Sequence, residues 1–114
     1  MTPELFRQLA LSFPEAVEGW QRGKIDFRVG GRIFATLGYP DAAWGMVKLT
    51  PSEQAWLLAT EPEMFRPVLG TWGQRGSTHV QLTVATELVL QDALQKAWRR
   101  QAPARLLRRN GQTT

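Results

Sequence analysis

The spacing of apolar residues along the chain predicts helices at two early positions. The first helix carries a stripe at i, i+3, i+4 and i+7 that consists of Phe6, Leu9, Ala10 and Phe13. Thr2 and Pro3 precede this stripe as an N-cap and a first helical residue, and Pro14 ends the helix. The second begins at a capping box, Thr50-Pro51-Ser52-Glu53, and ends before Pro62.

Alternation of polar and apolar residues predicts the strands. It covers residues 24–29, 32–37, 44–49 and 79–84. Gly30-Gly31 joins the first two of these strands as a two-residue hairpin, because both central positions of a type I′ turn need a positive φ. Residues 64–76 are rich in Gly and Pro, which is typical of an edge strand or an irregular loop.

A final helix follows Thr86, with a buried stripe formed by Leu90, Ala93, Leu94 and Ala97, and Pro103 ends or kinks it. The predicted order of elements is α-β-β-β-α-β-β-α. This order favours an α+β fold, a two-layer α/β sandwich in which helices cover one face of an antiparallel five-stranded sheet. We expect a single domain over residues 1–107 and a disordered basic tail over residues 108–114.

Because successive side chains of a strand point to opposite faces, the alternation also predicts the face that the helices leave open. The residues expected toward the core are Ile25, Phe27, Val29, Ile33, Ala35, Leu37, Val47, Leu49, Val80 and Leu82. The residues expected on the open face are Lys24, Asp26, Arg28, Arg32, Phe34, Thr36, Trp44, Met46, Lys48, His79 and Gln81. The assignment assumes strands without a β-bulge, since one bulge exchanges the faces.

The predicted open face is basic, with apolar residues between the cations. Arg28, Arg32 and Lys48 can position phosphates, and Phe34 and Trp44 can stack on bases, as in proteins that bind single strands. Exposed aromatic and Met side chains also mark protein contacts, so Phe34, Trp44 and Met46 are equally candidates for binding a partner or a second copy of the chain. A third alternative places these three side chains under the 64–76 segment.

Charge is distributed unevenly along the 114 residues, whose net charge is +4. Residues 1–95 hold eight basic groups and all ten acids, whereas residues 96–114 hold six basic groups and no acid. Such an end attracts polyanions, and the candidate nucleic-acid contacts in it are Arg99, Arg100, Arg105, Arg108 and Arg109. The alternative is a solvated tail that aids solubility.

Composition narrows the classes of function. The chain has no Cys, which excludes disulfides and Cys-based metal sites and fits a reducing cytoplasm. No charged region followed by an apolar run marks a secretory signal, and no apolar run reaches the length of a membrane span, so we expect a cytoplasmic protein without a membrane partner.

Catalytic and metal-binding patterns are weak. His79 is the only His, and although Ser77 lies two residues before it, the sequence implies no third group to orient them. Glu15, Glu18 and Asp26 have an ordinary role in solvating a helix end and a loop. We therefore expect no enzyme, no cofactor and no metal. A small-ligand pocket near Trp20, Trp72 and His79 is a further hypothesis.

Several local strings resemble the MmcQ/YjbR family of small bacterial proteins. These strings are Leu11-Ser12-Phe13-Pro14, Phe27 to Ala35 around Gly30-Gly31, Val47-Lys48-Leu49, Trp72-Gly73 and the final amphipathic helix. The resemblance implies an α-β(3)-α-β(2)-α architecture, similar to type III secretion chaperones. It also implies DNA as a ligand, because members are usually called DNA-binding proteins. Many members carry Ser-Tyr where this chain has Ala97-Trp98. The two leading hypotheses are a DNA-binding module and a homodimeric protein-interaction or chaperone-like domain.

Overall fold

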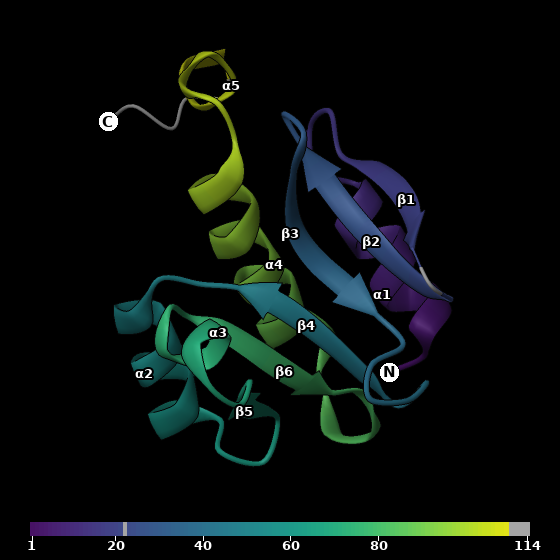
Figure 1. Ribbon diagram of the computed structural model, residues 1–114, viewed down its shortest axis with the longest axis vertical. Coiled ribbons are helices and arrows are strands. Elements are labelled where there is room, and N and C mark those ends of the chain that lie inside the picture. The colour runs from purple at the N-terminus through teal and green to yellow at the C-terminus, as the bar shows by residue number, and fades with distance from the viewer. Residues whose placement is uncertain (22, 110–114) are drawn as a thin grey trace.

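An antiparallel sheet of six strands, covered by helices on one face, forms the structure (Figure 1). This computed structural model describes residues 1–21 and 23–109. In chain order the elements are α1 (Pro3–Leu11), β1 (Val17–Gln21), β2 (Lys24–Val29), β3 (Arg32–Leu37), β4 (Trp44–Lys48), α2 (Pro51–Thr60), β5 (Phe65–Pro67), α3 (Thr71–Gln74), β6 (Ser77–Gln81), a 3-10 turn (Leu82–Val84), α4 (Glu87–Gln101) and α5 (Ala104–Arg109). The strands lie in the order β1-β2-β3-β4-β6-β5. The predicted α+β class is confirmed, with one strand more than expected.

Local signals place the helix starts and the first hairpin as predicted. The Leu5 amide donates to Thr2 Oγ1 at 3.1 Å, and Thr50 and Glu53 form the reciprocal capping box. Gly30 and Gly31 have φ values of +58° and +80°, which only glycine adopts readily, so the tight β2–β3 turn is confirmed. Thr86 precedes α4, but its side chain makes no capping hydrogen bond.

Two of the strands lie at the edges of the sheet and have weak sequence signals. β1 falls in the segment expected to be a connector, because its residues are mostly exposed on both faces and show no alternation. β5 is only three residues long and lies within the 64–76 segment, where an edge strand was one of two expectations. In addition, β6 stops at Gln81, and the residues after it turn into a 3-10 helix instead of continuing the strand.

A β-bulge in the β2–β3 hairpin exchanges the predicted faces of three residues, Arg32, Ile33 and Phe34. Phe27 pairs with Ala35, but the next residue, Arg28, pairs with Ile33, so Phe34 is the extra residue of β3. Phe34 is therefore turned toward the helices, is 0% exposed and packs edge-to-face with Phe13. The prediction that Phe34 lies on the open face and contacts bases or a partner is wrong, and Ile33 takes that place.

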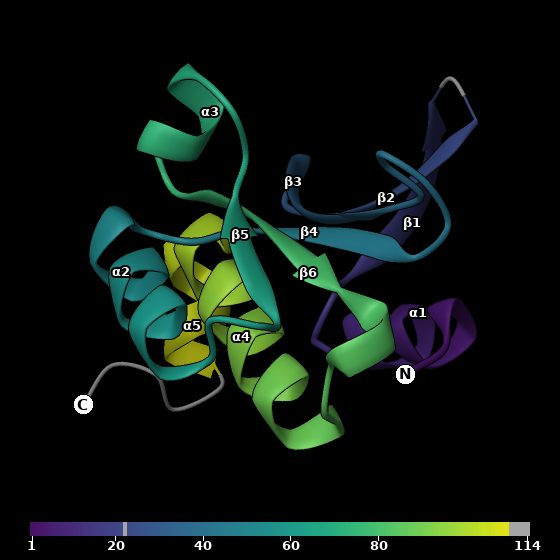
Figure 2. The same ribbon diagram turned by 90° about the horizontal axis from the view of Figure 1, so that it is seen from below.

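Four of the five described α-helices, all except the short α3, pack on one face of the sheet. α4 crosses β3 and β4, α1 lies beside α4, and α2 and α5 complete the same layer (Figure 2). The fully buried Phe and Leu side chains of this layer and of the sheet include Phe6, Phe27, Phe34, Phe65, Leu49, Leu57, Leu82, Leu90, Leu94 and Leu106. On the other face only the short α3 rises beside the sheet among the described elements, so most of that face remains open.

Candidate functional site

The open face is hollowed where β3 and β4 separate. These strands share only three residue pairs, from Leu37 with Gly45 to Ala35 with Val47, and diverge beyond them (Figure 1). A cleft of about 250 Å³ lies at this divergence. It is lined by Lys24, Ile33, Thr36, Tyr39, Met46, Lys48, Val68, Trp72, Ser77 and His79.

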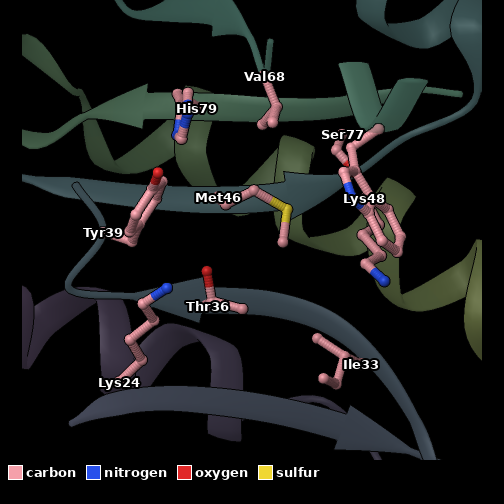
Figure 3. A pocket seen from close by; sticks show the side chains of 10 residues that line it. Lys24, Ile33, Thr36, Tyr39, Met46, Lys48, Val68, Ser77 and His79 are labelled. Carbon is pink, nitrogen blue, oxygen red and sulfur yellow. The ribbon is translucent and has the colours of Figure 1, made fainter. Parts of the chain in front are cut away.

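Apolar side chains form the floor of the cleft. Figure 3 shows Met46 in the middle, Ile33 and Thr36 from β3 on one side, and Val68 and His79 on the other. Since Met46 lies on β4 with its neighbours Gly45 and Val47 buried toward the helices, the predicted alternation of this strand is confirmed. The result is an apolar surface, with hydroxyl and imidazole groups at its sides, on a rigid sheet.

A continuous chain of cations and aromatic rings begins at one end of the cleft with Lys24, Tyr39 and His79 and extends beyond the cleft to Trp44 and Arg66. Lys24 Nζ lies 3.9 Å from the centroid of the Tyr39 ring, and this ring stacks on His79 at 6.1 Å between centroids. His79 in turn contacts the edge of Trp44 at 5.8 Å, and the Arg66 guanidinium carbon lies 5.3 Å from the Trp44 centroid. Each cation therefore lies against a π face, where the ring quadrupole attracts it.

The opposite end of the cleft combines Lys48, Trp72 and Ser77. Lys48 Nζ lies 5.3 Å from the centroid of the Trp72 ring, and Lys48 pairs with Ser77 across β4 and β6. Burial, and secondly the nearby charge of Arg100, lower the pKa of the Lys48 ammonium. This end is therefore a partly desolvated, positive corner beside an aromatic ring that is 61% exposed.

A buried amide holds the segment that walls this end. Gln54 on α2 donates from Nε2 to Gly73 O at 3.0 Å, Ser77 O at 3.1 Å and Thr78 Oγ1 at 3.0 Å. Its acceptors lie on α3 and β6, on either side of the turn that joins them, so one side chain fixes both. Gln54 was not expected at the site, because a Gln within an amphipathic helix carries no signal of its distant partners.

The surroundings of His79 disfavour its charged form. Burial lowers the pKa of the imidazole, an effect that the Gly45 backbone partly offsets. Its Nδ1 atom is buried and has no hydrogen-bond partner among the described residues. Within the described part of the chain no group of three or more His, Asp or Glu side chains is placed to hold a metal ion.

Of the three cations predicted to position phosphates, Arg28 is paired with a carboxylate and Arg32 lies on the opposite face of the sheet. Asp26, which is 3% exposed, accepts from Arg28 Nε at 2.9 Å and from Arg28 Nη2 at 3.2 Å, and this pairing raises the pKa of Arg28. Arg32 pairs with Val29 and therefore shares the helix-covered face with it, so the prediction that Arg32 lies on the open face is wrong. Of the three, Lys48 alone lines the cleft.

The basic C-terminal segment is folded up to Arg109 and lies on the helix side. Arg100 donates to the carbonyl groups of Leu49 and, at 3.1 Å, Arg75. Arg105 donates two hydrogen bonds of 3.0 Å to Glu15, and this pairing raises the pKa of Arg105.

The remaining cations of this segment are distributed along two helices. Arg99 on α4 and Arg108 on α5 are exposed, and Arg109 belongs to α5. The disordered tail was expected from residue 108. Its first two residues are helical, and residues 110–114 lie outside the described part of the chain.

The expected association of Trp72 and His79 is found, but Trp20 lies elsewhere. Trp20 lines a separate cleft of about 190 Å³ together with Leu37. Tyr39 and Arg66 were not recognised in the sequence, because one lies in a turn and the other in a three-residue strand. Trp44 and Met46 do lie on the open face, half-buried.

Comparisons with known proteins agree with the fold. The sequence model of the YjbR family matches residues 11–100. Among solved structures, the Deinococcus radiodurans protein DR2400, described as a DUF419 domain, superposes with a TM-score of 0.73 at 15% identity. The alignment covers 96% of this chain and 88% of that chain. No curated protein matches the chain. None of the described helices has the length and hydropathy needed to cross a membrane.

Proposed function

This chain belongs to the YjbR family, and we propose that it is a non-enzymatic binding module whose open sheet face binds single-stranded nucleic acid. The observation that carries the proposal is the alternation of cations and exposed rings around the cleft, from Lys24 and Tyr39 to Lys48 and Trp72. Proteins that bind single strands combine a positive groove for phosphates with aromatic side chains on which bases stack. DNA is also the ligand that the family resemblance implies.

A single strand suits this face better than a duplex does. The aromatic rings can stack only on bases whose faces are free, and a duplex keeps its base faces inside the stack. The face is hollowed at Met46 instead of flat, so an unpaired strand can follow it where a rigid rod cannot. Among the described residues, the cations beside the rings of this face are Lys24, Lys48 and Arg66.

Binding of a fluorescently labelled, mixed-sequence DNA single strand tests the proposal. With three cations engaged, the slope of log K against log salt is expected to be about −2, since each neutralised phosphate of a single strand contributes about −0.7. We expect a triple Lys24→Ala, Lys48→Ala, Arg66→Ala variant to lose binding. As a control, an Arg99→Ala, Arg108→Ala variant, which removes two exposed cations of the helix side, should bind as the wild type does.

Two results contradict the proposal. Absence of strand binding by the wild type at low salt removes the function itself. Loss of binding in the Arg99→Ala, Arg108→Ala variant, with the open-face variant unaffected, moves the site to the helix side.

A second candidate function, self-association or protein binding, is favoured by one observation. Tyr39 and Trp72 line the cleft and are largely exposed, and Leu69, which follows the cleft residue Val68 in the chain, is largely exposed too. Exposed apolar groups that gather in one place mark protein contacts. Light scattering of the wild type and of a Trp44→Ala, Met46→Ala variant tests this function, which predicts a dimer that the double substitution dissociates. A wild-type protein that stays monomeric at high concentration contradicts self-association.

A further inference from the structure

We infer that the cleft between β3 and β4 is a site for one unstacked base, a planar heteroaromatic ring, whose phosphate binds at the Lys48 end. This inference rests on the proposed function and deepens it, because it assigns one nucleotide of the ligand to one set of residues. The same chemistry, a base joined to a phosphate, is also present in a free nucleotide. Titration with a nucleoside monophosphate distinguishes the two sources.

The size and lining of the cleft select a single ring system. Its volume of about 250 Å³ lies just under the range of roughly 300–1,000 Å³ typical of pockets for drug-sized ligands. The side chains of Ile33, Met46 and Val68 form an apolar floor that matches a flat ring face, and the hydroxyl groups of Thr36 and Ser77 can hydrogen-bond with ring edges. A base fits this combination, because its faces are apolar and its polar groups are at the edge.

The phosphate is assigned to the Lys48 end because of the charges there. Lys48 is half-buried and lines the cleft, and Arg100 donates to the carbonyl of Leu49, the residue that follows Lys48. An anion at this corner would interact favourably with both cations and relieve their repulsion. The Arg100 guanidinium is already fixed by the Leu49 and Arg75 carbonyls, so little ordering is needed. At the other end, Lys24 is already close to the Tyr39 ring.

The wall beside Trp72 is formed before any ligand arrives. Gln54 binds the segment on both sides, and the backbone packs so closely that a Cβ atom on Gly73 would lie 1.7 Å from Val68 O. A wall held in this way does not have to be ordered by the ligand, which lowers the entropic cost of binding.

Titrations with a DNA single strand and with an abasic phosphodiester strand of the same length test the base site. Because one stacked base contributes about 1–3 kcal/mol, the strand with bases is expected to bind at least about tenfold more tightly. The Trp72→Ala variant should remove most of this difference. The Trp56→Ala variant is the matched control, since Trp56 is 56% exposed and lies 5.1 Å from Lys96 Nζ, but on α2.

Titration with a nucleoside monophosphate, with inorganic phosphate as comparison, identifies the source of the base. A strand that binds more tightly than the monophosphate supports nucleic acid as the ligand. If the monophosphate binds in a way that depends on Trp72 and Lys48 and the strand does not bind, the base site is supported and the strand-binding function is contradicted.

Two outcomes overturn the base site. Equal affinity for the abasic and the complete strand shows that no base enters the cleft, while the proposed nucleic-acid function survives. Equal effects of Trp72→Ala and Trp56→Ala exclude this cleft as the site.

Discussion

The substitution Gln54→Met tests whether one buried amide holds the wall of the cleft. Met has a similar length and no branch, so it fills the same space without the two N–H groups. The substitution removes the donor to Gly73 O, Ser77 O and Thr78 Oγ1, all of which belong to buried residues. The perturbation is therefore the loss of hydrogen bonds with little change in volume.

The expected loss of stability depends on the hydrogen bonds that the acceptors retain in the variant. Gly73 O still accepts from the Gly76 amide at 3.0 Å, and Ser77 O still accepts from the Val68 amide at 3.0 Å. The cost per lost partner is accordingly near the lower end of the range of about 1–3 kcal/mol for an unsatisfied buried group. Since an NH₂ group has two protons, we expect the free energy of unfolding to fall by about 2–3 kcal/mol.

Urea unfolding followed by circular dichroism measures this loss. With a slope of about 1–3 kcal/mol per M, the urea midpoint should fall by about 0.7–3 M. The control is Gln91→Met, an exposed position of α4 where a change within about 0.5 kcal/mol is expected. A Gln54→Met variant as stable as this control would refute the reasoning, because the three contacts would then contribute nothing to the wall.

Two further predictions concern the bulge and the imidazole. Phe34→Ala should lower the free energy of unfolding, measured in urea, by about 3–5 kcal/mol, and Ile33→Ala should lower it distinctly less. Unbroken alternation implies the reverse order, so equal or inverted losses would contradict the bulge. By NMR, His79 should titrate with a pKa below 6.5, because burial disfavours its charged form. The unfolded state then binds more protons between that lowered pKa and 6.5, so stability should rise with pH across this window, and His79→Gln should abolish that part of the rise. A midpoint at or above 6.5 would show that the ring is not desolvated.

Most of the fold could be predicted from local signals, because those signals act over a few residues. The Thr50 capping box and the Gly30-Gly31 turn are formed as expected, since a cap or a positive φ depends only on near neighbours. The edge strand β1 was missed because it buries little on either face and so shows no period. The short β5 had only an ambiguous signal, since three residues are too few to display an alternating period.

The candidate site was predicted in part. Alternation placed Met46 and Lys48 correctly on the open face, because β4 runs without a bulge. It failed at Phe34, where one extra residue in β3 turns a ring of the expected contact surface into the core. The positive charge of each arginine is evident from the sequence. Its partner is not, so the pairing of Arg28 with the buried Asp26 and of Arg105 with Glu15 could not be predicted.

The sequence by itself determined the kinds of element, their order and the helix-covered architecture, because these follow from periodicity, caps and turns within short windows. Only the tertiary structure decided where β3 and β4 part, that Tyr39, Trp72 and His79 line one cleft, and that Gln54 reaches across to its wall. These features depend on contacts between residues far apart in the chain. Their geometry is set by how the whole sheet twists and packs, which no local pattern records.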